Sequence, residues 1–323
     1  MMVNSKVITF LLLVFFTVNQ NANSQLPFPK KPVVIYDNDD HRDVYTDEFL
    51  MALSHLKKVR LKAFITTYPH HEYPLFVKGR DEIIELADQS GLKNLPVYLE
   101  GTDETLKMPE SKRISDTEPL AVAASNYIVK RARQHSRKNP LVLITGGSLT
   151  TFANALLLDP SISNKIIVTG VFGCPDLDYN AGLDPWAWSI VMNSCRVVSI
   201  PIGPTGNRAE VYMKAAQVEK DEIKNQLNQN VPLFKWMLIK HHPGNDLPNG
   251  HDFDGQPLLA MVEKDYITEI TRYRCTGVDE QGKALFEKDP EGKIYVTEQA
   301  DQEVATDYFW KTFTKTQKKI KTD

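Results

Sequence analysis

The chain has 323 residues and is close to charge balance, with 38 Lys and Arg residues against 41 Asp and Glu residues. A net charge of −3 over this length gives none of the basic footprint that nucleic-acid binding requires. Its cysteines, Cys174, Cys195 and Cys275, cannot all pair, which excludes a disulfide scaffold. A single Cys174–Cys195 disulfide remains the alternative to two small buried thiols.

The first predicted element is a cleavable export signal at residues 1–24. Lys6 gives it a positive start, residues 7–18 form its apolar core, and small polar residues lead to Ser24. An apolar run of about a dozen residues is too short to span a bilayer, which takes ~20. We therefore expect a secreted or periplasmic protein without a membrane anchor after cleavage, the alternative being a buried first helix. Residues 25–323 are expected to form one domain.

Beyond the signal, apolar runs alternate with helical patterns, which is typical of a parallel sheet covered by helices on both faces. The predicted strands are residues 33–37, 61–66, 96–99, 141–145, 165–171 and 196–200. The predicted helices between them are residues 46–56, 77–90, 119–135, 148–157 and 185–193. The pattern therefore predicts an α/β fold of Rossmann-like type with a mostly parallel central sheet.

Past residue 205 the alternation weakens, and the rest is expected to be a hairpin and helix extension of the same domain. Its predicted helices are residues 210–229, 231–241 and one from 257 onward, and its predicted strands are residues 272–276 and 293–297. A turn at residues 289–292, Asp-Pro-Glu-Gly, would lead into the second strand. The basic residues 315–321 are expected to be a solvated helix end or a frayed terminus.

The segment most informative about function follows the first predicted strand, where six carboxylates lie between Asp37 and Glu48. Side chains alternate along a strand, so Asp37 and Asp39 point the same way at its end. Asp47 and Glu48 fall in the first turn of the next helix, for which Thr46 is the expected N-cap. Ligands bind at the carboxyl ends of such strands, and crowded carboxylates suit Ca²⁺ or Mg²⁺ better than Zn²⁺. The alternative is an acidic helix start stabilised by the helix dipole, next to a surface loop.

This segment resembles the N-terminal fingerprint of the calcium-dependent nucleoside hydrolases (inosine-uridine type N-ribohydrolases). That fingerprint is an apolar strand, Asp-x-Asp, a short glycine-containing turn, Asp-Asp and a helix rich in Ala and Leu. Asp37-Asn38-Asp39 matches its first part, and residues 47–53 match its second. The loop between them is longer than in the family and lacks its Pro-Gly, and Glu48 stands where the family has Asp.

Further matches follow in the family's order, from about residue 32 to about residue 265. Residues 143–151 resemble its Thr-Gly-(Gly/Pro)-Leu-Thr-Asn turn, with one extra residue. Asp178-Tyr179-Asn180 resembles its ribose-binding Glu-Phe-Asn, although Asn180 could instead cap a turn. The family's late Asp is matched best by Asp254, directly ahead of an apolar helix, with Asp252 as the alternative.

The resemblance implies hydrolysis of the N-glycosidic bond of ribonucleosides, or of a related pentoside, by a calcium-oriented water. Asp39 would be the general base. The implied calcium ligands are Asp39, Glu48, Asp254 and the backbone carbonyl of Thr145. The implied substrate-binding residues are Asp47, Asp178, Asn180 and His251.

The group that assists the leaving base is not fixed by these motifs, because Phe253 stands where the family often has His. The candidates are His70, His71, His241, His242 and His251. Trp186 and Trp188 could stack on a base, but their apolar helix favours packing in the core.

Two other functions fit the same sequence, which is also compatible with a homo-oligomer. One is a secreted, non-catalytic protein of this fold that binds a sugar or nucleoside with calcium. The other is a glycosidase for another pentoside, using the same residues on a different leaving group. Retention of Asp39, Asp47 and Asp254 together favours the enzyme, because a pure binder needs no base beside the ion.

Overall fold

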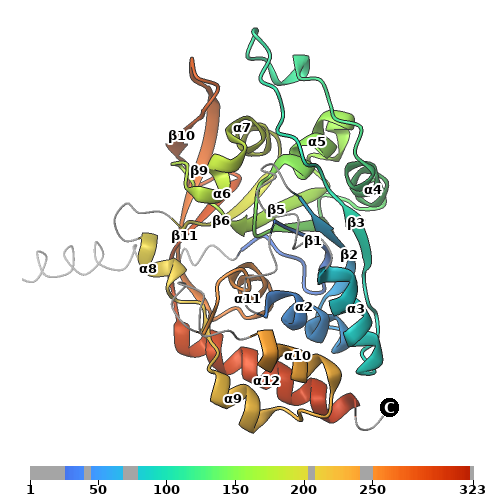
Figure 1. Cartoon of the computed structure of the whole chain (residues 1–323). Helices are drawn as coiled ribbons and strands as arrows, with labels where there is room; N and C mark the ends of the chain where they lie inside the picture. Colours follow the sequence, from blue (N-terminus) through green and yellow to red (C-terminus); the bar gives the residue numbers. More distant parts are fainter. Residues whose placement is uncertain (1–25, 40–44, 68–78, 203–207, 241–249, 321–323) are drawn as a thin grey trace, which may run out of the picture.

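A nine-stranded sheet forms the centre of the protein in its computed structural model, which describes residues 26–39, 45–67, 79–202, 208–240 and 250–320 (Figure 1). Its strand order is β10-β9-β11-β6-β5-β4-β1-β2-β3. These strands are β1 (Val33–Asn38), β2 (Arg60–Thr66), β3 (Val97–Glu100), β4 (Leu141–Thr145), β5 (Ile166–Val171), β6 (Arg196–Ile200), β9 (Ile267–Val278), β10 (Ala284–Lys288) and β11 (Ile294–Ala300). All pairings are parallel except those of β9 with β10 and β11.

Helices connect most of these strands. The α-helices are α2 (Thr46–His55), α3 (Gly79–Gln89), α4 (Ala123–Ala132), α5 (Thr150–Leu158), α6 (Tyr179–Leu183), α7 (Pro185–Ser194), α8 (Arg208–Tyr212), α9 (Lys220–Gln226), α10 (Pro232–Lys240), α11 (Gln256–Val262) and α12 (Gln302–Ile320). Two short 3₁₀ helices, η2 (Ile114–Asp116) and η3 (Pro160–Ile162), and a two-stranded pair, β7 (Ala216–Gln217) with β8 (His251–Asp252), complete the described elements. The predicted α/β fold with a mostly parallel sheet is confirmed.

The sheet separates two hydrophobic cores, as β1 shows most clearly. Its side chains alternate between faces, so Val33 and Ile35 enter one core while Val34 and Tyr36 enter the other. The first core is closed by α4, α5 and α7, and the second by α2, α3, α10, α11 and α12 (Figure 1). Because both faces are covered, every residue of β1 is buried, which accounts for its nearly continuous apolar sequence.

The cysteines and tryptophans predicted to lie in the core are buried there. Cys174 and Cys195 are both buried and form no disulfide, so the disulfide alternative is wrong. Trp186 and Trp188 are buried in the first core, as their apolar helix predicted.

Among the described residues, none of the helices has the length and apolarity needed to cross a membrane. The predicted export signal at residues 1–24 lies outside this part of the chain.

The predictions for the C-terminal part are only partly correct. The helix predicted at residues 210–229 is wrong, because that segment forms α8, β7 and α9. The two predicted strands exist as β9 and β11 and pair antiparallel, but β10 lies between them in sequence and pairs with β9 as well. The basic tail is the end of α12, and its Thr316 is fully buried, so this end is solvated on one side only.

The last helix packs against the helix that follows the acidic segment. All ten residues of α2 are buried, and Phe49 of α2 lies 5.2 Å from Phe309 and 6.3 Å from Phe313 of α12 between ring centroids. The predicted N-cap of α2 is wrong by one residue. Tyr45 occupies the cap position, and the Thr46 hydroxyl donates to Asp252 instead.

We predict that Phe49→Ala lowers the free energy of unfolding by about 3–5 kcal/mol, because it opens a cavity in the aromatic contact between α2 and α12. Urea unfolding followed by circular dichroism measures this. Leu285→Ala, at a position 46% exposed on β10, is the control and should change stability by less than about 0.5 kcal/mol. Equal effects of the two substitutions would contradict the described packing.

Candidate active site

The candidate site lies where the order of the sheet reverses. From β1 the chain builds β2 and β3 on one side and then returns to build β4, β5 and β6 on the other. In open α/β sheets, ligands bind at this switch point, beyond the carboxyl ends of the strands. Here those ends are Asn38 and Asp39 after β1, and the Gly146–Gly147 turn after β4.

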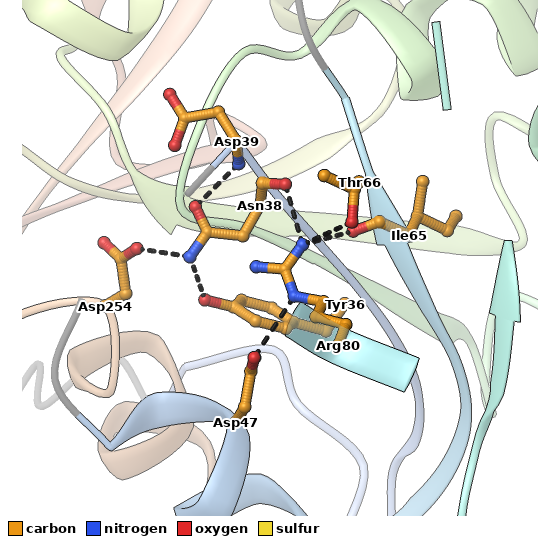
Figure 2. Close-up of polar contacts among 8 residues, drawn as sticks. All are labelled: Tyr36, Asn38, Asp39, Asp47, Ile65, Thr66, Arg80 and Asp254. Carbon is orange, nitrogen blue, oxygen red and sulfur yellow. Dashed lines mark hydrogen bonds and ion pairs between the residues drawn. The ribbon is translucent and has the colours of Figure 1, made fainter. Parts of the chain in front are cut away.

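The side chain of Asn38 connects two of the predicted acidic residues (Figure 2). Its Oδ1 accepts the backbone N–H of Asp39 at 2.8 Å. Its Nδ2 donates to Asp254 Oδ2 at 2.9 Å and to the Tyr36 hydroxyl at 2.6 Å. Asn38 and Asp254 are buried, whereas Asp39 is partly exposed, so the Asp39 carboxylate is the member of this group that solvent reaches.

Two glycines make room for these carboxylates. A Cβ on Gly146 would lie 2.0 Å from Asp254 Oδ2, and a Cβ on Gly147 would lie 2.8 Å from the Asp39 Cγ. Real Cβ atoms do not come so close to other atoms, so neither position accepts a side chain in this conformation. The turn therefore brings Asp39 and Asp254 together, from distant parts of the sequence. Asp254 rather than Asp252 occupies this place.

A buried arginine, Arg80 of α3, lies below this group (Figure 2). It is 2% exposed, and its Nε donates to Asp47 Oδ2 at 3.2 Å. Its Nη1 donates to the backbone oxygens of Asn38 at 2.9 Å and Ile65 at 3.0 Å, and to the Thr66 hydroxyl at 2.8 Å. The guanidinium thus links the ends of β1 and β2 to the first turn of α2.

The charge of Arg80 is strongly favoured. Burial acts to lower its pKa, but the nearby Asp47, Tyr36 and Asp37 outweigh burial, so the pKa is raised above its usual value. The second oxygen of Asp47, Oδ1, is buried without a hydrogen-bond partner among the described residues. Asp47 therefore keeps one acceptor for a further donor.

Asp37 is a strongly perturbed carboxylate of the site. It is 1% exposed, and the Thr67 hydroxyl donates to its Oδ2 at 2.6 Å. Burial raises its pKa from 3.8 to about 7, against the opposing effects of Thr67 and Arg80. Its Oδ1 is buried with no hydrogen-bond partner in the described part of the chain. Asp37 thus supports the end of β1 from inside the protein.

One of the predicted calcium ligands, the Thr145 carbonyl, points away from Asp39 and Asp254. The Gly146 N–H donates to the Asp37 carbonyl of β1. A trans peptide directs its N–H and C=O to opposite sides, so the Thr145 carbonyl faces β5, where a Cβ on Gly170 would lie 2.3 Å from it. Glu48 is fully buried in α2. The pKa of Tyr45 is raised mainly by the burial of Tyr45 and next by the negative charge of Glu48.

The remaining predicted substrate residues contact the backbone. Asn180 donates from Nδ2 to the carbonyl oxygens of Gly146 and Val171, at 2.7 Å each, which joins the β4 and β5 turns. Asp178 caps α6, its two oxygens accepting the N–H groups of Ala181 at 3.2 Å and Ile202 at 3.0 Å.

His251 lies in β8 and its ring stacks on Phe253. Phe253 in turn stacks on Tyr212 of α8, with ring centroids 4.3 Å apart. The other candidate histidines, His70, His71, His241 and His242, lie outside the described residues.

As placed, the described residues do not fit a calcium ion. Asp39 and Asp254 meet at the glycine turn, but within the described ranges no three His, Cys, Asp or Glu side chains are close enough to hold a metal. Calcium takes about six to eight oxygen ligands, and the Thr145 carbonyl faces the other way. The positive charge that these residues do hold at the site is that of Arg80.

Arg80 was missed by the sequence analysis, and no signal in the sequence identified it. It stands in the first turn of a helix, where a cation is disfavoured by the helix dipole and an exposed position is the usual expectation. Only the fold reveals that its side chain turns inward to Asp47.

Comparison with known structures identifies the fold. The fold resembles a plant nucleoside hydrolase, with a TM-score of 0.61 and 17% identity over 88% of this chain and 99% of that one. A purine-preferring ribonucleoside hydrolase from Gardnerella vaginalis has a TM-score of 0.59 and 17% identity, over 88% of this chain and 99% of that one. An inosine-uridine preferring nucleoside hydrolase from Bacillus anthracis has a TM-score of 0.59 and 15% identity, over 89% of this chain and 99% of that one. The fold is therefore that of the nucleoside hydrolases.

The family follows from the sequence profile. Residues 34–313 match the profile of the inosine-uridine preferring nucleoside hydrolases, whereas no curated protein sequence matches the chain significantly. The chain belongs to this family, as a divergent member, and is a nucleoside ribohydrolase-like enzyme. The predicted resemblance and the predicted enzyme class are confirmed.

We predict that the protein loses stability as the pH rises through 7, because of Asp37. The folded state keeps this proton up to about pH 7, whereas the unfolded chain releases it near the usual value of 3.8. The proton therefore stabilises the fold fully below pH 3.8, and this contribution disappears as the pH rises through 7. The loss between about pH 5 and about pH 8 should be about 2 kcal/mol.

Urea unfolding of the wild type and Asp37→Asn at both pH values measures this contribution. The variant carries no titrating group at this position and should lose correspondingly less stability over the interval. Identical pH dependence in the two proteins would show that Asp37 does not hold its proton as described.

Proposed function

We propose that the protein hydrolyses the N-glycosidic bond of a ribonucleoside or a related pentoside, with Asp39 as the general base. The observation that carries the proposal is the position of Asp39. It is a partly exposed carboxylate at the switch point of the sheet, held by Asn38 and adjacent to the buried Asp254, in a chain of the nucleoside hydrolase family.

In the proposed reaction a water attacks C1′ of the sugar and Asp39 takes one of its protons. The new C1′–O bond forms as the C1′–N bond breaks, and the bonding electron pair leaves with the base, which takes up a proton from solvent or from His251. The transition state carries positive charge on the sugar, which the carboxylates of Asp39 and Asp254 stabilise.

The proposal also assigns sugar contacts. Asp47 would accept a hydroxyl through Oδ1, the oxygen that Arg80 does not hold. Asn180 would offer its amide oxygen, because its Nδ2 already donates to the backbone. Asp178 would accept a hydroxyl in addition to its backbone bonds, since each carboxylate oxygen accepts more than one donor.

A calcium-oriented water is the finer version of this mechanism. The family resemblance gives Asp39, Glu48, Asp254 and the Thr145 carbonyl as the ligands of that ion. Since the described residues do not fit the ion as placed, the steps proposed above involve only the protein's own groups. Adding calcium or a chelator to the hydrolysis assay tests this finer version directly.

A second candidate is a non-catalytic binder of a nucleoside or sugar. It is favoured by Glu48, which stands where the family has Asp, and by the lengthened loop that precedes it in the sequence. Isothermal titration with nucleosides separates the two functions, because a binder gives heat of binding without release of free ribose.

Export is part of the proposal as well, on the basis of residues 1–24. Cells expressing the full chain should release or transfer to the periplasm a protein that begins near residue 25, as N-terminal sequencing would show. Recovery of the uncleaved chain in the cytosol would contradict it.

We predict that Asp39→Asn reduces the rate of ribose release by about 10²–10⁴, because the amide cannot take a proton from water. Release of reducing sugar from a panel of purine and pyrimidine nucleosides measures the rate, and circular dichroism checks the fold. Asp265→Asn, at an exposed position, is the matched control and should keep full activity. If the wild type releases no ribose from any nucleoside, with or without calcium, the enzymatic proposal is wrong.

A further inference from the structure

The surroundings of Arg80 form a site built for a positive charge. Its acceptors are the Asp47 carboxylate, the Thr66 hydroxyl and the backbone oxygens of Asn38 and Ile65. The ring of Tyr36, 5.7 Å from the guanidinium carbon, adds further negative potential.

The position of Arg80 in α3 makes this arrangement informative. A cation in the first turn of a helix faces the positive end of the helix dipole, and a guanidinium that is 2% exposed has lost its hydration. An arginine is unfavourable under both conditions unless nearby groups compensate its charge and accept its hydrogen bonds. Here both are used, because Asp47 needs a countercharge and the ends of β1 and β2 need donors.

The pair with Arg80 also fixes Asp47. One carboxylate oxygen accepts from Arg80 Nε, and the other is a buried acceptor with no partner among the described residues. Because Arg80 occupies one oxygen of this carboxylate, the other oxygen is the acceptor that Asp47 offers to a ligand hydroxyl.

We propose that Arg80 is the resident cation of this site, so that the ends of β1 and β2 and the acidic first turn of α2 are held together without a bound divalent metal. Arg80 is thus a positioning residue that acts on a ligand through Asp47. The inference relies on the proposed function only for the location of the site, and its test does not measure hydrolysis.

The test compares thermal unfolding in calcium chloride with that in EDTA, and calcium binding by isothermal titration. The wild type should unfold at the same midpoint in both solutions. Arg80→Met leaves Asp47 buried without its countercharge, so its midpoint in EDTA should fall. Calcium should then raise that midpoint by several degrees, because an ion that binds the folded state stabilises it by mass action.

Two further variants separate the charge from the hydrogen-bond geometry. Arg80→Lys keeps the charge but loses the planar fork, so it should be less stable than the wild type yet insensitive to calcium. Asp47→Asn combined with Arg80→Met removes both charges and should be more stable than Arg80→Met alone, again without a calcium response.

A matched control is Arg272→Met. Arg272 also stacks on an aromatic ring, that of Tyr295, and donates to a backbone oxygen, but it lies in β9, far along the sheet from β1. This variant should show no calcium response. It measures how much of any effect comes simply from removing a partly buried arginine.

The proposal is overturned if calcium stabilises the wild type as strongly as Arg80→Met, or if Arg80→Met folds and does not respond to calcium. If Arg80→Met does not fold, the doubly substituted protein decides: a folded double variant supports the countercharge role, and an unfolded one contradicts it. A wild type that releases no ribose would end the hydrolase proposal and leave this one standing.

Discussion

The burial of carboxyl groups at the end of β1 and at the start of α2 is the constraint on which the surrounding structure depends. Asp37 and Asp47 are both almost completely removed from water, where an uncompensated carboxylate is costly. The protein meets this cost in two ways: the raised pKa lets Asp37 keep its proton, and Arg80 pairs with Asp47. The second solution requires α3 to begin beside α2. Asp39, one residue beyond β1, remains the carboxylate that solvent reaches.

The parallel part of the fold could be predicted from the sequence because its strands are buried on both faces, which imposes long apolar runs. Val33 to Tyr36 show this directly, since alternate residues enter different cores. The antiparallel edge could not be predicted in the same way. The strand β10, Ala284–Lys288, mixes charged and apolar residues because it lies at the edge of the sheet with one neighbour. Residues 210–229 carry a helical pattern, but pairing of β7 with β8 interrupts it, and such pairing depends on residues distant in sequence.

For the site, the sequence predicted which residues lie there better than it predicted where their carbonyl groups and side chains point. Asp39 and Asp254 are brought to the same glycine turn, because Gly146 and Gly147 leave room for both. The orientation of the Thr145 carbonyl depends on which neighbouring strand receives the Gly146 N–H, and no local pattern encodes that choice. The role of Arg80 could not be predicted from the sequence for a similar reason, because its partners come from three different elements.

The contact between α2 and α12 has a consequence for how the molecule forms. The helix that carries Asp47 and Glu48 is buried on all sides, and part of its cover is Phe309 and Phe313, close to the end of the chain. Contacts between such distant segments close late, because the entropy of the long intervening loop must be overcome first. During synthesis the acidic helix therefore lacks its final packing until α12 has left the ribosome. A helix encoded far downstream thus completes the support of the candidate site.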